Sequence, residues 1–137
     1  MRPDPEQLAQ MPLFRSLSSE QLEAMATLTE LRQEEVGTVL VGAGVPGYSL
    51  FILQEGTASV TGGGEPLPEL GPGDFFGEIA LLGKRERTAT VTATSPVTLV
   101  VMLGSDFRVF ERDWPDAAEQ MKQAMAERLA RSPGGNP

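Results

Sequence analysis

The stretch GPGDFFGEIALLGKRERTATV, residues 71–91, decides how the chain is interpreted. It opens with a Gly-Pro-Gly turn, places an acidic residue among apolar ones, and ends in an alternation of Thr with Ala and Val. Lys84, Arg85 and Arg87 put three of the 11 basic residues within four positions, although the chain has a net charge of −8. A positive patch of this kind suits a phosphate, which a guanidinium grips through two hydrogen bonds.

An acidic residue within the same stretch indicates which chemical groups the ligand carries besides a phosphate. Glu78 has apolar neighbours, and a buried carboxylate is costly unless it is hydrogen-bonded or paired. Gly77 allows close backbone approach, and a helical turn from Ile79 could offer free N–H groups to an anion. Because a carboxylate accepts from hydroxyls, we expect a sugar phosphate or a nucleotide. The spacing alone leaves a structural Glu78–Arg87 ion pair as the alternative.

The residues around this stretch are predicted to form short strands. The chain has 15 glycines and 11 prolines, and glycine and proline punctuate residues 31–104 at short intervals, which is typical of a barrel or sandwich. The run 48–53 is mostly apolar, so we expect it to be covered on both faces. The predicted strands are Thr38–Val41, Tyr48–Leu53, Ala58–Thr61, Thr88–Thr94 and Val97–Leu103.

Helices are predicted on both sides of the strands, over residues 4–30 and 105–131. Asp4 is expected to cap the first helix with Gln7 as its capping-box partner, and Ser18 a second helix with Gln21. The stretch 11–14 separates these two helices, and the buried stripe of the second is expected to be Leu22, Met25, Ala26 and Leu28.

In the C-terminal part, Ser105 is expected to cap a helix over 106–112, and Pro115 to begin the final helix. That helix carries an apolar stripe, which could pack on the barrel or on a second copy of the chain. Residues 1–131 are predicted to form a single domain, with 132–137 as a loose tail. The stripe consists of Ala118, Met121, Met125 and Leu129.

Composition excludes several classes of function. The chain has no cysteine and no histidine, which excludes disulfide scaffolds, thiolate or imidazole metal sites, thiol catalysis and His-based triads. The acidic balance argues against nucleic acid as a partner. No apolar run is long enough for membrane insertion, and residues 1–5 lack the core of a signal peptide. We expect a cytoplasmic protein with no resident metal or cofactor.

Residues 42–47, GAGVPG, match the dinucleotide fingerprint GxGxxG. That fingerprint requires a helix at its third glycine. Here the following residues are rich in strand formers, so we interpret the segment as a glycine-rich hairpin.

The segments FGEIAL at 76–81 and RTATV at 87–91 resemble the phosphate-binding cassette of the cyclic nucleotide-binding domain family. The resemblance extends over nearly the whole chain, through 12–14, 51–60 and 70–78, and is strongest to the cytoplasmic domains of bacterial cyclic nucleotide-gated potassium channels. It implies a mainly β fold with flanking helices: a CRP-like antiparallel β-roll or jelly-roll barrel, N-terminal helices, a short phosphate-binding helix and two C-terminal helices.

The resemblance also implies residue roles. Glu78 would hold the ribose 2′-hydroxyl, and Arg87 would pair with the cyclic phosphate. The backbone N–H groups of Gly77, Ile79 and Ala80 would meet the ribose and phosphate. Further ligand-binding candidates are Thr88 at the phosphate or purine edge, Val60, Leu67 and Leu82 as an apolar wall, and Arg128 of a final lid helix, stacked on the base or else simply solvated.

The implied function is a regulatory sensor with no catalytic residues. It would bind a cyclic nucleotide, with cAMP favoured over cGMP, and signal by moving its C-terminal helix to control an attached or partner effector such as a channel. The family's Gly-Glu-x-Gly-Asp loop is replaced here by Gly44-Val45-Pro46-Gly47-Tyr48, which lacks both acids. The alternatives are a ligand-free protein-interaction module of the same fold, a cupin-type enzyme lacking its usual histidines, and a transcription factor lacking its helix-turn-helix.

Overall fold

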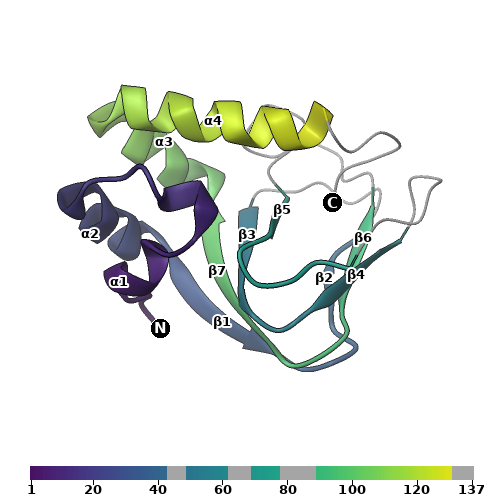
Figure 1. The fold of residues 1–137 in the computed structure, drawn as a ribbon. Coiled ribbons are helices and arrows are strands. Elements are labelled where there is room, and N and C mark those ends of the chain that lie inside the picture. Colours follow the sequence, from purple (N-terminus) through teal and green to yellow (C-terminus); the bar gives the residue numbers. More distant parts are fainter. Residues whose placement is uncertain (43–48, 62–68, 78–88, 131–137) are drawn as a thin grey trace.

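The computed structural model describes residues 1–42, 49–61, 69–77 and 89–130, with side chains up to residue 127. Helices stand at both ends of these residues and strands between them (Figure 1). The elements are α1 (Pro5–Leu8), the 3₁₀ helix η1 (Pro12–Phe14), α2 (Ser19–Leu28), β1 (Glu30–Glu34), β2 (Val39–Val41), β3 (Ser49–Glu55), β4 (Ala58–Thr61), β5 (Phe75–Phe76), β6 (Thr90–Ala93), β7 (Val97–Leu103), α3 (Gly104–Asp113) and α4 (Pro115–Ala130).

The strands form two antiparallel sheets. One has the order β1-β7-β3-β5 and the other the order β2-β6-β4. Within the described residues these are separate sheets rather than one closed barrel. The predicted mainly β architecture with flanking helices is confirmed, and the strands expected at 38–41, 48–53, 58–61, 88–94 and 97–103 are found over their described residues with ends that differ by one or two positions.

The four-stranded sheet is apolar on both faces, as predicted for the run 48–53. Successive side chains of a strand point to opposite faces. On β3, Leu50 and Ile52 pack with the helices, whereas Phe51 and Leu53 pack against the other sheet. The sheet therefore separates two cores.

We call these cores the helical cluster and the roll cluster. The helical cluster contains Leu8, Met11, Leu13, Phe14, Leu17, Met25, Ala26, Leu50, Ile52, Val100, Met102, Phe107, Phe110, Ala118, Met121 and Met125. The roll cluster contains Val41, Phe51, Leu53, Ala58, Val60, Leu70, Phe76, Ala89, Val91, Ala93, Val97, Leu99 and Val101.

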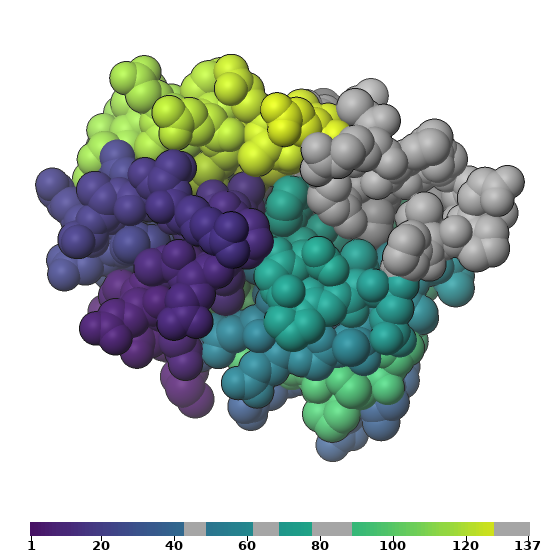
Figure 2. Space-filling view, viewed as in Figure 1, coloured from purple at the N-terminus to yellow at the C-terminus, as the bar shows by residue number. Residues whose placement is uncertain are grey.

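The N-terminal helices and α4 lie side by side over one end of the roll (Figures 1 and 2). Ala118, Met121 and Met125 of α4 are buried in the helical cluster. The apolar stripe thus packs on its own chain as far as residue 125; the side chain of Leu129 lies outside the described residues. An ion pair between Lys122 and Glu111 ties α4 to α3.

Of the predicted caps, Asp4 and Ser18 are confirmed, whereas the partner Gln7 and the cap Ser105 are wrong. Ser18 and Gln21 form the expected capping box at α2, with N···O distances of 3.1 and 2.9 Å. Asp4 caps α1 by accepting from the N–H of Glu6, but the Gln7 side chain hydrogen-bonds Gln54 and so does not close a capping box. Helix α3 begins at Gly104, one residue before the predicted cap Ser105, with Leu103 at the cap position and no side-chain cap.

Two strands were not predicted. The strand β1 lies at the edge of the four-stranded sheet, and its residues are mostly polar. The carbonyl of Met1 accepts from the N–H of Leu31 at 2.7 Å, which brings the N-terminus to this strand. The strand β5 has only two residues.

A strand also follows the GxGxxG match. Residues 43–47 of that segment lie outside the described residues, and β3 begins at Ser49. A strand over residues 49–55 is not the helix that the fingerprint requires, whereas the hairpin itself stays a prediction. The division into a domain of 1–131 and a tail of 132–137 stays a prediction, because residues 131–137 are not described.

Candidate functional site

Most of the predicted ligand-binding residues lie outside the described part of the chain. Of the predicted set, Val60 and Gly77 are described fully and Arg128 by its backbone in α4. The others belong to the segments 62–68 and 78–88; they are Leu67, Glu78, Ile79, Ala80, Leu82, Arg87 and Thr88. The structure therefore describes the residues that flank the predicted site rather than most of the ligand-binding residues themselves.

The chain enters the segment 78–88 through a conformation suited to glycine. Gly77 directly follows β5 and has a φ of 81°. This left-handed backbone is accessible to glycine without the penalty that a Cβ brings. Any other residue would strain the turn that immediately precedes Glu78.

The residue before this turn is a core anchor. Phe76 is fully buried, and its ring stacks on that of Phe51 with centroids 5.2 Å apart and planes 11° apart. These two residues are also paired in the ladder between β3 and β5. Such ring pairs contribute roughly 0.5–1.5 kcal/mol beyond the area they bury. The N-terminal flank of the segment is thereby fixed to the four-stranded sheet.

The C-terminal flank is anchored equally firmly, in the other sheet. Ala89 and Val91 are fully buried, and β6 pairs with β4 so that Val91 lies opposite Val60. The predicted alternation from 88 to 94 is confirmed over its described residues: the alanines and valine face inward, and the threonines are partly or fully exposed.

Both flanks meet in one core. Phe76, Ala89 and Val60 all belong to the roll cluster, although Phe76 lies in β5 of one sheet and Ala89 immediately precedes β6 of the other. Glu78 is two residues from Phe76, and Arg87 is two residues from Ala89. The fold therefore gathers the attachment points of the predicted acid and the predicted cation into the same buried cluster.

Val60 is 5% exposed, and its side chain belongs to the interior of the roll. That position is compatible with an apolar wall. Arg128 lies three residues beyond Met125, the last described residue of α4 that is buried.

Two negative findings apply to the described residues only. No group of three or more acidic side chains there is arranged to hold a metal ion. None of the helices there is both long and apolar enough to cross a membrane.

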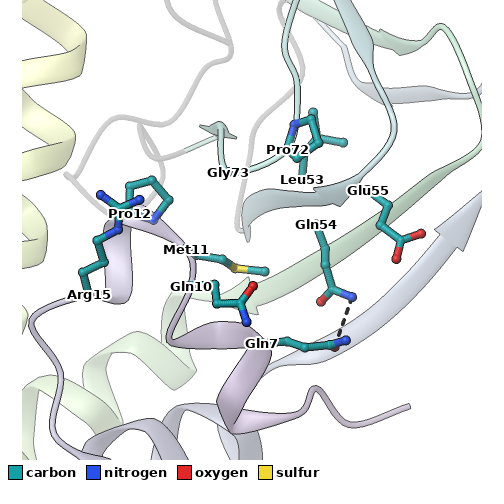
Figure 3. Close-up of a pocket in the computed structure, with 10 residues that line it drawn as sticks. All are labelled: Gln7, Gln10, Met11, Pro12, Arg15, Leu53, Gln54, Glu55, Pro72 and Gly73. Carbon is teal, nitrogen blue, oxygen red and sulfur yellow. Dashed lines mark hydrogen bonds between the residues drawn. The ribbon is translucent and has the colours of Figure 1, made fainter.

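One feature of the described structure was not predicted from the sequence. A pocket of about 360 Å³ lies between the N-terminal helices and the end of β3 (Figure 3). A glutamine in a strand carries no sequence signal for such a pocket.

Comparison with known proteins places these observations in a family. The family model described as the cyclic nucleotide-binding domain matches residues 31–112. A cyclic nucleotide-gated potassium channel from Mesorhizobium japonicum is 36% identical over 122 residues, which cover 88% of this chain and 34% of the channel. A cAMP-dependent protein kinase regulatory subunit from Hypocrea atroviridis is 34% identical over 95 residues, covering 69% of this chain and 21% of that protein.

The fold comparison agrees. The crystal structure of the Thermus thermophilus catabolite activator protein is similar with a TM-score of 0.77 and 28% identity, over 88% of this chain and 59% of that chain. The resemblance to the domains of bacterial channels and the CRP-like fold are thus confirmed. The chain spans about a third of the length of the channel relative.

Proposed function

The chain belongs to the cyclic nucleotide-binding domain family, and from this premise we propose that it is a cytoplasmic sensor that binds cAMP in preference to cGMP and reports binding through its C-terminal helix. The proposal includes no catalytic step. The output would pass to an effector, either attached to this domain or separate, such as an ion channel. The channel and kinase relatives support an effector of this kind, because in both the matched region is a minor part of a longer protein.

The observation that carries the proposal is the common anchoring of the two flanks. Phe76 and Ala89 hold both ends of the segment 78–88 in the roll cluster. Glu78 would accept from the ribose 2′-hydroxyl, and Arg87 would neutralise the cyclic phosphate. Because the attachment points are fixed in one core, little conformational entropy would be lost in bringing these two groups to one ligand.

The remaining contacts follow from position along the chain. The N–H groups of Gly77, Ile79 and Ala80 would meet the ribose and phosphate, and a donor array of this kind suits an anion. Thr88 would contact the phosphate or the purine edge. Val60, Leu67 and Leu82 would form the apolar wall around the base.

The choice of cAMP rests on a relative. The kinase subunit is named for its dependence on cAMP, and it is 34% identical over the matched residues. A hydroxyl at Thr88 suits guanine recognition without excluding adenine, so cGMP is the natural competitor in any test.

The side chains that α4 buries in the helical cluster limit the proposed movement of this helix. Separating Met121 and Met125 from the helical cluster would cost about 1.5–3 kcal/mol for each side chain. The movement is therefore proposed for the part of α4 beyond Met125. Arg128 lies in that part and would stack over the purine as the lid closes.

The test is a calorimetric titration of the full chain with cAMP and with cGMP. We expect saturable binding of both, tighter for cAMP. Arg87→Leu should weaken cAMP binding roughly thirtyfold or more, because loss of a partner to a buried phosphate charge costs about 2–5 kcal/mol.

The matched control is Arg108→Leu, since Arg108 is an exposed arginine of α3 outside the predicted site. Its affinity should equal that of the wild type. Equal affinity in the Arg87 variant would remove that residue from the site. Failure of the wild type to bind either nucleotide would instead argue for the ligand-free interaction module.

A further inference from the structure

A polar groove lies between the N-terminal helices and the four-stranded sheet (Figure 3). Its volume is about 360 Å³. Three glutamine side chains dominate its polar lining, from α1, from the residues before η1 and from β3; they are Gln7, Gln10 and Gln54. Arg15, Glu55 and Met11 also line it, and we call it the amide groove.

A β-bulge places Gln54 in this groove. In the pairing of β3 with β7, Leu53 lies opposite Leu99 and Glu55 lies opposite Thr98, so Gln54 has no partner residue of its own. Bulges redirect the side chain of the extra residue and are common beside functional sites. Here the side chain is directed to α1, where its Nε2 donates to Oε1 of Gln7 at 3.2 Å.

The other polar atom of this amide is unsatisfied. Oε1 of Gln54 is buried and has no hydrogen-bond partner among the described residues. Rotating the amide by 180° would only exchange the roles of its two atoms, because each needs a partner of its own. A buried acceptor left without a donor is destabilised, because its lost hydrogen bonds to water are not replaced. An incoming N–H or O–H group would therefore be stabilised at this acceptor once the Gln54 side chain turns toward the open part of the groove.

The groove is also electrically polarised. Figure 3 shows Arg15 and Glu55 at opposite ends, with the three glutamines between them. Arg15 is exposed, and within the described part of the chain it takes part in none of the ion pairs. Glu55 is shared with a second pocket of about 500 Å³ that also includes Glu34 and Glu35. One end is therefore cationic and the other is acidic.

We infer that the amide groove docks an extended polypeptide segment whose basic residues lie toward Glu55 and whose acidic residues lie toward Arg15. A glutamine amide matches a peptide group, since each offers one N–H side and one carbonyl side. Three such amides suit a main chain, and Gln54 Oε1 would accept one of its N–H groups once the Gln54 side chain turns toward it.

The lining favours a peptide over a small molecule. Gln7, Gln10 and Arg15 are exposed residues at the surface of the molecule. Small-ligand sites are mostly apolar and enclose most of their ligand. The effector that the proposed function requires would supply such a segment, but the groove itself does not depend on nucleotide binding.

The test measures fluorescence anisotropy of labelled synthetic peptides with the full chain. Two nine-residue peptides carry three lysines at one end and three aspartates at the other, one in each chain direction, with three alanines between. A third has the same composition with the charges alternating. We expect one of the segregated peptides to bind at least about tenfold tighter than the alternating one.

Variants decide whether the groove is responsible. Gln54→Met should weaken the preferred peptide roughly three- to tenfold, as expected for one lost hydrogen bond. It should not lower the melting temperature, because it removes a buried unsatisfied acceptor, and it should leave the affinity for cAMP unchanged. Gln120→Met, at an exposed glutamine of α4, is the matched control and should bind like the wild type. Arg15→Glu should abolish the preference for segregated charges.

Equal binding of the three peptides would overturn the proposal, since the acidic chain would then attract lysines without a groove. Undiminished binding by Gln54→Met and Arg15→Glu would overturn it as well. Neither result bears on the nucleotide site, because the calorimetric titration with cAMP reports on that site separately.

Discussion

The helical cluster and the roll cluster share a sheet but are built from different side chains. Five of the six methionines of the chain, all but Met1, lie in the helical cluster. The roll cluster has no methionine and contains five valines: Val41, Val60, Val91, Val97 and Val101. Valine is stiff at χ1, whereas methionine is unbranched and fills irregular space.

This difference matches what each cluster holds. The roll cluster anchors both flanks of the predicted nucleotide segment, where a fixed shape is needed. The helical cluster holds α4, the helix whose end is proposed to move. A core rich in methionine tolerates repacking beneath such a helix at low cost. The comparison shows that one sheet can support a stiffly packed core on one face and an adaptable core on the other.

The largest expected loss of stability comes from removing the Phe76 anchor of β5. Phe76→Ala should lower the free energy of unfolding by about 3–5 kcal/mol, because it leaves a cavity in the roll cluster and removes the stacking on Phe51. Phe75→Ala should cost less, roughly 1–2 kcal/mol, since Phe75 is only partly buried against the helical cluster. Urea unfolding measures both. Equal losses in the free energy of unfolding would mean that the side chains on the two faces of β5 contribute equally to stability.

A smaller effect sharpens the contrast between stiff and adaptable packing. Val91→Leu adds a methylene to the roll cluster and should cost about 1–3 kcal/mol. Met125→Leu nearly conserves volume in the helical cluster and should cost less than about 1.5 kcal/mol. Thermal unfolding of the two variants compares them directly. A larger loss for the methionine variant would contradict the assignment of adaptability.

The smallest effect is spectroscopic and needs no change in stability. The chain has no cysteine, so Ala130→Cys provides a single attachment point for a fluorophore at the end of α4. cAMP should shift the emission of this label. Trp114, the only tryptophan, packs against the helical cluster and should keep its emission, because the buried part of α4 stays in place. A shift at Trp114 would mean that the whole helix moves.

Much of this fold is predictable from the sequence, and the exceptions have physical reasons. The apolar run of β3 and the alternation of β6 predicted two-sided and one-sided burial, and both are found. The strand β1 was missed because its residues, Glu-Leu-Arg-Gln-Glu, show no regular alternation; an edge strand needs little apolar surface. The strand β5 is too short to give a pattern.

Local polar chemistry was the least predictable. Gln7 stands at the spacing of a capping box, yet its side chain bonds Gln54, a residue 47 positions away. The sequence contains no sign of that contact, nor of the bulge that produces it. The site residues of the segment 78–88 stay a prediction from the cassette resemblance, because the structure describes only the residues that flank this segment.

The polar edge strand has a consequence for behaviour in concentrated solution. An unpaired strand edge is a template on which another chain can extend the sheet. Here the edge carries Glu30, Arg32 and Glu34, and the carbonyl of Met1 occupies the N–H of Leu31. Charged side chains along such a border discourage stacking of copies into fibrils. The domain is thereby protected against aggregation at the β1 edge of its four-stranded sheet.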